Sequence, residues 1–289
     1  MKLVSYQVGN TARTGIVRNG TVYELRELLP DAPATMRDVI EAGSPLLERL
    51  SKALDGSDAA GVPLDSVKLL MPLEDPGKVI CLGLNYADHA KEGGHDVPEY
   101  PSLFLRVRTS LIAHDEPIVR PRCSERLDYE AELMVIVGKK CRHLDESNAL
   151  DPIFGYSVFN DGSIRDYQRK TAQWTAGKNF DATGPVGPWI VTADELPPGA
   201  TGLRIRSMLG DRTLQDSNTS NMIFSVQRTM ILLTEIMTLE PGDMIAMGTP
   251  EGVGHPRNPP LWLKPGDRIS IDIEHIGTLS NPVVDETAG

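Results

Sequence analysis

One run of residues organises this chain: Asp128-Tyr129-Glu130-Ala131-Glu132-Leu133-Met134-Val135-Ile136-Val137-Gly138. Its second half is short, apolar and β-branched and ends at a glycine, which indicates a buried strand rather than a helix. Side chains alternate faces along a strand that rises about 3.3 Å per residue, so Glu130 and Glu132 share a face about 7 Å apart. Two buried carboxylates need a cation or basic side chains to neutralise them. The run therefore predicts a metal site, with a solvated edge strand as the alternative.

The composition limits the kinds of partner. The 289 residues include 29 Lys and Arg against 40 Asp and Glu, a net charge of −11, and they contain no Lys/Arg-rich run. We therefore expect no nucleic-acid or membrane partner, since no apolar run approaches the roughly 20 residues of a membrane span. The amino terminus lacks the apolar core of a signal peptide, and three cysteines without Cys-x-x-Cys spacing favour reduced thiols. These features predict a cytoplasmic protein that acts on a small molecule.

A small unit precedes the main one. Strands are expected at Met1–Val8 and at Gly15–Leu25, the second turning back on itself at Asn19-Gly20. Short amphipathic helices are expected at Thr35–Glu41 and Ser44–Leu54, followed by a linker rich in Asp, Ala and Gly. We predict a small N-terminal α/β domain over residues 1–67 and a predominantly β domain over residues 68–289, an α+β fold overall.

A short predicted helix carries the first candidate reactive pair. The helix follows Asn85, a plausible N-cap, and ends at Gly93-Gly94. His89 and Glu92 are three residues apart and share a face, so the carboxylate can hold the imidazole in one tautomer, as a general base requires. The glycines would let this helix move as a lid. The alternative, favoured for an isolated His-x-x-Glu, is an exposed polar pair on a surface helix.

Further polar residues lie at the ends of predicted strands. Asp161 follows the apolar strand 154–159, where ligands are often placed, although it could instead cap a turn and pair with Arg165. Arg165 and Gln168 share a face of the helix that follows. Lys178 lies in a loop rich in glycine and proline, where a lone lysine ordinarily faces solvent.

A second glycine-rich segment, Gly248-Thr249-Pro250-Glu251-Gly252-Val253-Gly254, lies near the carboxyl end. It is not a phosphate loop, because the Gly-Lys-Ser/Thr ending is absent. Its free amides, starting at Gly248, and the Thr249 hydroxyl could still hold a substrate carboxylate.

Five segments in this order resemble the fumarylacetoacetate hydrolase family, in its common bacterial form with a small leading domain. The segments are 83–92, the acid strand 128–133, Asn160 to Gln168, Gly177-Lys178 with its Gly-Pro continuation, and 248–254. The resemblance covers most of residues 70–284. It implies the family's mixed β-sandwich roll and a homodimer.

The resemblance also assigns roles residue by residue. Glu130, Glu132 and Asp161 would be the carboxylate ligands of one divalent ion. The lid dyad that activates water would be His89 and Glu92, while Lys178 and Gln168 would face the reacting oxygens. Arg165 and Thr249, with the adjoining Gly248, would bind the substrate's carboxylate end.

One departure from the family pattern is Arg106-Val107-Arg108, where members often show a Lys-Pro pair. The extra guanidinium groups suggest a different, anionic substrate tail. Surface or dimer ion pairs are the alternative.

The ligand set then predicts the chemistry. All-oxygen coordination selects a hard cation, Mg²⁺ first, with Mn²⁺ or Ca²⁺ as alternatives. We expect a hydrolase that cleaves a C–C bond in a 3-acylpyruvate or other 2,4-diketo acid, giving pyruvate or a related 2-oxo acid and a carboxylic acid. An oxaloacetate-type decarboxylase or a 2-oxo-acid hydratase or isomerase could use the same site. A metal-stabilised binding module is the non-enzyme alternative, which His89 and Glu92 disfavour because a structural site needs no base.

Overall fold

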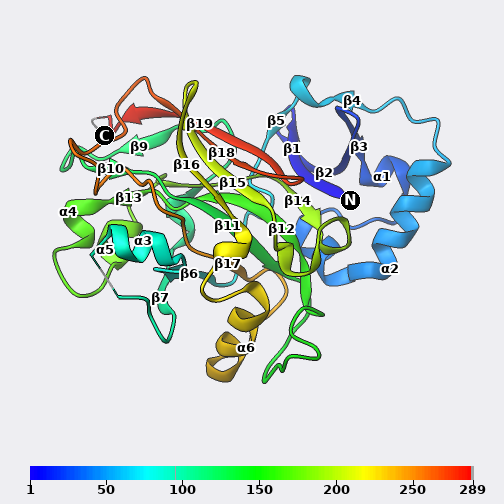
Figure 1. The fold of residues 1–289 in the computed structure, drawn as a ribbon. Helices are drawn as coiled ribbons and strands as arrows, with labels where there is room; N and C mark the ends of the chain where they lie inside the picture. The colour runs from blue at the N-terminus through cyan, green and yellow to red at the C-terminus, as the bar shows by residue number, and fades with distance from the viewer. Residues whose placement is uncertain (95, 288–289) are drawn as a thin grey trace.

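The computed structural model describes residues 1–94 and 96–287, so residues 95, 288 and 289 of the predicted main domain lie outside the described part. Within that part the strands form two large sheets and one small one (Figure 1). The larger sheet has the order β4 (Val62–Pro63), β3 (Thr21–Glu24), β2 (Thr11–Arg18), β1 (Lys2–Val8), β14 (Gly184–Thr192), β12 (Ile153–Asn160), β11 (Ala131–Val137), β17 (Met244–Ala246), β6 (Val79–Gly83) and β7 (Ser102–Leu105), with β5 (Lys68–Leu69) beside β1 and β8 (Leu111–Ile112) beside β14.

The second sheet has the order β16 (Arg212–Asn218), β15 (Arg204–Leu209), β18 (Arg268–Ile273), β19 (Gly277–Asp285) and β9 (Ile118–Arg120), and β10 (Leu127–Asp128) pairs with β13 (Ser163–Ile164). The described helices are α1 (Leu25–Leu28), α2 (Met36–Asp55), α3 (Ala87–Glu92), α4 (Arg165–Gln168), α5 (Thr175–Lys178) and α6 (Val226–Ile236).

The two large sheets pack face to face around a common hydrophobic core. Leu133 and Val135 of β11 lie in this core with Ile205 and Ile271 of the second sheet. The alternate residues of β11 point the other way into a second core, so the strand is buried on both faces. The predicted mixed, predominantly β sandwich is therefore confirmed.

The N-terminal elements extend the larger sheet, because β1 pairs antiparallel with β14. The Asn19-Gly20 hairpin forms as predicted, with φ angles of 51° and 76°. The two predicted helices form α2, which breaks at Gly43, where φ is 61°. The division at residue 67 stays a prediction.

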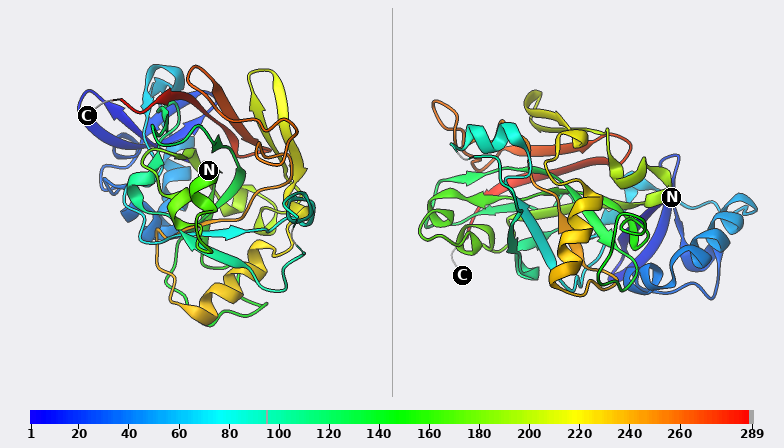
Figure 2. Two further views of the ribbon diagram at one scale, coloured as in Figure 1. Left: turned by 90° about the vertical axis from the view of Figure 1, so that its left-hand side faces the viewer. Right: turned by 60° about the horizontal axis from the view of Figure 1, so that its bottom comes forward.

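The elements that carry polar residues gather at one end of the molecule. Figures 1 and 2 show α3, α4 and α5 at the end opposite α1 and α2. None of the described helices combines the length and apolar character needed to cross a membrane. The three cysteines are free, and Cys123 is exposed.

Candidate active site

The pairing of β11 with β12 brings the predicted ligands together. Ala131 lies opposite Asn160, and the amide of Asp161 donates to the carbonyl of Glu130 (3.0 Å), so the residues just beyond each strand are neighbours. One carboxylate oxygen from each of Glu130, Glu132 and Asp161 lies within 4.8 Å of the others. All three side chains are buried. The solvated-edge alternative is therefore wrong for these acids.

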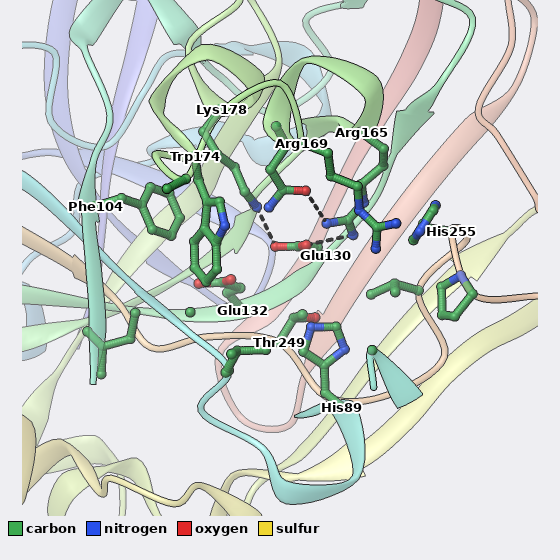
Figure 3. A pocket seen from close by; sticks show the side chains of 18 of the residues that line it. His89, Phe104, Glu130, Glu132, Arg165, Arg169, Trp174, Lys178, Thr249 and His255 are labelled. Atoms are coloured by element: carbon green, nitrogen blue, oxygen red, sulfur yellow. Dashed lines mark hydrogen bonds and ion pairs between the residues drawn. The ribbon is translucent and has the colours of Figure 1, made fainter. Parts of the chain in front are cut away.

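Three cations support the acids. Lys178 Nζ donates to Glu130 Oε2 (2.7 Å) and Asp161 Oδ2 (2.6 Å), so the prediction of a solvent-facing lysine fails. Arg106 donates to Asp161 Oδ1 (2.5 Å) from behind. Arg165 Nη2 lies 2.7 Å from Glu130 Oε1 (Figure 3). Arg165 thus pairs with Glu130 rather than with Asp161, the partner suggested by the turn-cap alternative.

The charges of this cluster do not balance within the described residues. Four buried carboxylates (Asp128, Glu130, Glu132 and Asp161) face three buried cations (Arg106, Arg165 and Lys178). Burial by itself would raise the pKa of Glu130, but Lys178 and then Arg165 outweigh it and lower that pKa to about 2. Burial, followed by the charges of Asp161 and Glu130, raises the pKa of Glu132 well above its ordinary value. Glu132 is therefore the acid with least compensation.

The donor set fits a divalent ion. Among the described residues, the Glu132 carboxylate has one hydrogen-bond donor, the amide of Gly248 (2.9 Å). Its remaining lone pairs, with those of Glu130 and Asp161, offer converging hard oxygen ligands in a buried position. A bound cation would supply the missing positive charge.

The lid pair lies near the acids but is arranged differently from the prediction. His89 Nδ1 is 3.7 Å from Glu92 Oε2, beyond hydrogen-bond length, and no hydrogen-bond partner for Nδ1 exists among the described residues. Glu92 instead accepts from the amide of Gly252 (3.0 Å), which ties α3 to the loop 248–254. Burial opposes ionisation of Glu92, but His89 and this amide outweigh it and lower its pKa. Glu92 is therefore an anion beside the imidazole.

The predicted cap of this helix is wrong. The N-cap position is Tyr86, without a side-chain hydrogen bond. Asn85 donates to the carbonyls of Phe224 and Met247 and accepts from the amide of Phe224, so it joins three segments across the core.

A cavity of about 480 Å³ opens over the acids. Seven of the ten predicted site residues line it: His89, Glu130, Glu132, Arg165, Gln168, Lys178 and Thr249. Of the other three, Asp161 is fully buried beneath the cavity. The amide of Gly248 donates to Glu132, and Glu92 accepts from the amide of Gly252. Phe104 and Trp174 form an apolar wall with their rings 5.7 Å apart, on the side away from His255 (Figure 3).

The hydroxyl of Thr249 is oriented by a residue that the sequence did not indicate. Gln215 Nε2 donates to Thr249 Oγ1 (2.8 Å) and to the carbonyl of Pro250 (2.8 Å), and its Oε1 accepts from the amide of Ala131 (3.0 Å). Because the Thr249 oxygen already accepts one bond, its proton is free to donate toward the cavity.

The guanidinium groups noted at 106 and 108 do not line the cavity in the described structure. Arg106 is buried, where it donates to Asp161, the carbonyl of Gly162 and Thr183 Oγ1. Arg108 donates to the carbonyl of Glu74 (2.5 Å) at an exposed position. Neither side chain therefore supports the idea of an anionic substrate tail at this place.

Asp128, the first residue of the acid run, has no predicted role but joins two parts of the site. Its Oδ1 accepts from the amide of Gly254 (2.7 Å), and its Oδ2 accepts from the amide of His255 (2.9 Å) and from Arg165 Nε (2.8 Å). Position 128 falls on the predicted strand, but its partners come from distant segments, so no local pattern could indicate them.

Asp128→Asn should destabilise the protein by about 1 to 3 kcal/mol, because one oxygen becomes a donor that faces buried donors. Thermal unfolding measures this loss. Asp151→Asn, at an exposed turn, serves as the control and should change stability by less than about 0.5 kcal/mol. Equal stability of Asp128→Asn and the parent protein would contradict the role given to Asp128.

Comparisons with known proteins agree with this geometry. The family model described as Fumarylacetoacetate (FAA) hydrolase C-terminal matches residues 78–284. A protein named oxaloacetate tautomerase fahd2, mitochondrial, from Xenopus laevis is 38% identical over 98% of this chain and 90% of its own length.

Two solved structures resemble the whole chain. Maleylpyruvate hydrolase from Sphingobium sp. SYK-6, in complex with manganese(II) ion and pyruvate, has a TM-score of 0.83 and 31% identity, with 99% of this chain and 100% of that chain covered. 5-Carboxymethyl-2-hydroxymuconate delta-isomerase from Mycobacterium smegmatis has a TM-score of 0.78 and 32% identity, with the same coverage.

Proposed function

The chain belongs to the fumarylacetoacetate (FAA) hydrolase family, and from this membership we propose that it is an enzyme of 2-oxo acid enol chemistry, with keto–enol tautomerisation as its reaction. The observation that carries the proposal is the cluster of three carboxylates and Lys178 at the floor of the cavity. The tautomerase name of a relative matched over 98% of the chain favours proton transfer over bond cleavage.

The ion is assigned to Glu130, Glu132 and Asp161, with Mg²⁺ proposed and Mn²⁺ or Ca²⁺ as alternatives. When bound, it acts as a Lewis acid toward the oxygens of a 2-oxo acid. The related hydrolase structure that holds manganese and pyruvate supports a divalent ion beside a 2-oxo acid. A homodimer and a cytoplasmic location remain part of the proposal.

Lys178 acts as a fixed positive charge in this scheme. Burial alone would lower its pKa, but Asp161 and Glu130 outweigh burial and raise it, so the amine stays protonated. It therefore cannot serve as a base at neutral pH. Its role is to stabilise negative charge that develops on the substrate oxygens, together with Gln168, which lines the same cavity.

His89 moves the proton. An imidazole can both accept and donate a proton near neutral pH, and His89 lines the cavity across from Lys178 (Figure 3). We assign the transfer to Nε2, which takes the proton from C3 of the keto form and returns it to the C2 oxygen, so that no other reactant is needed. The anionic Glu92 lies 3.7 Å from the other ring nitrogen, Nδ1. Thr249 is assigned to the substrate's C1 carboxylate, while Arg165, which Asp128, Gln168 and Glu130 hold in place, contributes positive charge to the same cavity.

Hydrolysis of an acylpyruvate is the second candidate. The pairing of His89 with Glu92 at 3.7 Å favours it, because a carboxylate that supports an imidazole can activate water. The product would then be pyruvate and a carboxylic acid.

The proposal is tested by supplying Mg²⁺ and following the ultraviolet absorbance of enol-oxaloacetate, with acylpyruvates assayed in parallel for released pyruvate. Tautomerisation without release supports the first reaction, and release of pyruvate supports the second. Loss of carbon dioxide from oxaloacetate would favour a decarboxylase. No turnover of any compound would favour the binding module.

His89→Asn should reduce turnover by about 10² to 10⁴-fold, since the proton carrier is removed, while ion affinity stays within about threefold. Steady-state kinetics and calorimetric titration of Mn²⁺ measure the two effects. His143→Asn, on an exposed loop, is the matched control. Equal loss of ion binding in His89→Asn would count against the separate role assigned to the imidazole.

A further inference from the structure

The cavity contains a cation that the proposed chemistry does not use. Arg165 is committed to the protein: Nε donates to Asp128 (2.8 Å), Nη1 donates to Gln168 Oε1 (2.9 Å), and Nη2 lies 2.7 Å from Glu130. Arg169 lines the same cavity, and within the described residues it forms no ion pair. Its hydrogen-bond donors therefore remain available to a ligand.

The side chain of Arg169 is open to a ligand. Arg169 is the C-cap residue of α4, and its side chain is exposed to solvent while it lines the cavity. A guanidinium carries five N–H donors in a planar fork and suits the binding of a carboxylate.

His255 adds an independent sign of a ligand in the same part of the cavity. Its ring stacks on Trp262 at 5.7 Å, and its backbone amide is held by Asp128 (2.9 Å). Its Nδ1 is buried and has no hydrogen-bond partner among residues 1–94 and 96–287. A buried polar atom without a partner is costly, so it ordinarily meets water or a ligand.

The imidazole of His255 is neutral. Burial, and then the charges of Arg169 and Arg165, lower its pKa. In the tautomer that carries the proton on Nδ1, it donates a hydrogen bond without adding to the local positive charge. A guanidinium and a neutral N–H donor together match a carboxylate, which accepts several hydrogen bonds.

We propose that Arg169 and His255 bind a second carboxylate of the substrate, so that the enzyme prefers 2-oxo dicarboxylates to 2-oxo acids with an uncharged tail. This rests on the proposed function, because it places the 2-oxo end of the same molecule over Glu130 and Glu132. The wall of Phe104 and Trp174 lies on the other side of the cavity from His255, so it would contact the substrate away from the second carboxylate (Figure 3).

The test compares oxaloacetate with its C4 amide, 2-oxosuccinamate, which has the same shape but lacks the second charge. Calorimetric titration of the Mg²⁺-loaded protein with freshly dissolved compound gives the two dissociation constants independently of turnover. We expect oxaloacetate to bind at least about tenfold more tightly than 2-oxosuccinamate, because a hydrogen bond to a charged group contributes a gain of this size.

Arg169→Met should reduce that preference to threefold or less, and His255→Phe, which keeps the stacking on Trp262, should reduce it several-fold. Lys170→Met is the matched control. Lys170 is the next cation along the chain, but it lies over the Tyr167 ring (3.4 Å to the centroid) and not among the cavity-lining residues. Its removal should leave the preference as it is.

The outcomes separate the two proposals. Equal binding of both compounds to the parent protein, or an equal fall in preference for Arg169→Met and Lys170→Met, would overturn the second-carboxylate site and leave the enol chemistry standing. Failure of both compounds to bind would overturn both.

Discussion

Glu132→Gln should abolish binding of the divalent ion and turnover, yet make the ion-free protein more stable. Burial, and then the charges of Asp161 and Glu130, raise the pKa of Glu132, so its negative charge is unfavourable in the ion-free site. Glutamine keeps an oxygen for the Gly248 amide and offers a donor to the neighbouring carboxylates. Removing one of three like charges within 4.8 Å should stabilise the ion-free fold by roughly 1 to 3 kcal/mol.

Thermal unfolding in EDTA and in excess Mn²⁺ measures both effects. The parent protein should melt at a higher temperature with the ion, because a ligand that binds the folded state stabilises it. Glu132→Gln should melt higher than the parent in EDTA and show no shift with Mn²⁺. Glu146→Gln, at an exposed position, controls for the loss of one charge. A destabilised ion-free Glu132→Gln protein would show that the acids are not in conflict.

The residues that could be predicted are those whose positions follow from local periodicity. Strand alternation places Glu130 and Glu132 on one face, and the end of the next strand places Asp161 beside them, because neighbouring antiparallel strands are in register. The same reasoning found the hairpin at Asn19-Gly20.

The burial of a polar side chain by partners that are distant in the sequence could not be predicted. Lys178 is buried because β11 and β12 bring Glu130 and Asp161 to it from 48 and 17 residues away. Its loop composition predicts exposure, and only the tertiary fold reverses that. Arg169 and His255 each lie one residue beyond a recognised segment, and no local pattern assigned either of them to the cavity.

Arg106 shows how a departure from a family pattern can be structural. The sequence suggested a substrate contact, yet the side chain lies behind Asp161 and holds the oxygen Oδ1. Lys178 contacts the other oxygen, Oδ2. The carboxylate is thereby fixed from two sides, as ligand residues commonly are by a second layer of partners.

Lys178→Met should cost about 3 to 5 kcal/mol of stability without a divalent ion, because two buried carboxylates lose their common partner. Turnover should fall below detection, since the fixed charge that stabilises the developing negative charge is gone. Guanidinium unfolding in EDTA measures the stability loss. Arg204→Met, which breaks the exposed pair with Asp216, should cost no more than about 1 kcal/mol.

The same variant tests whether the ion and the lysine act on one cluster. Excess Mg²⁺ should recover part of the stability lost in Lys178→Met, because the ion supplies positive charge to the same Glu130 and Asp161. It should recover nothing in Arg204→Met. A Lys178→Met protein that Mg²⁺ stabilises no more than it stabilises the parent would show that Lys178 and the ion do not share these two carboxylates. The assignment of the metal site would then fail.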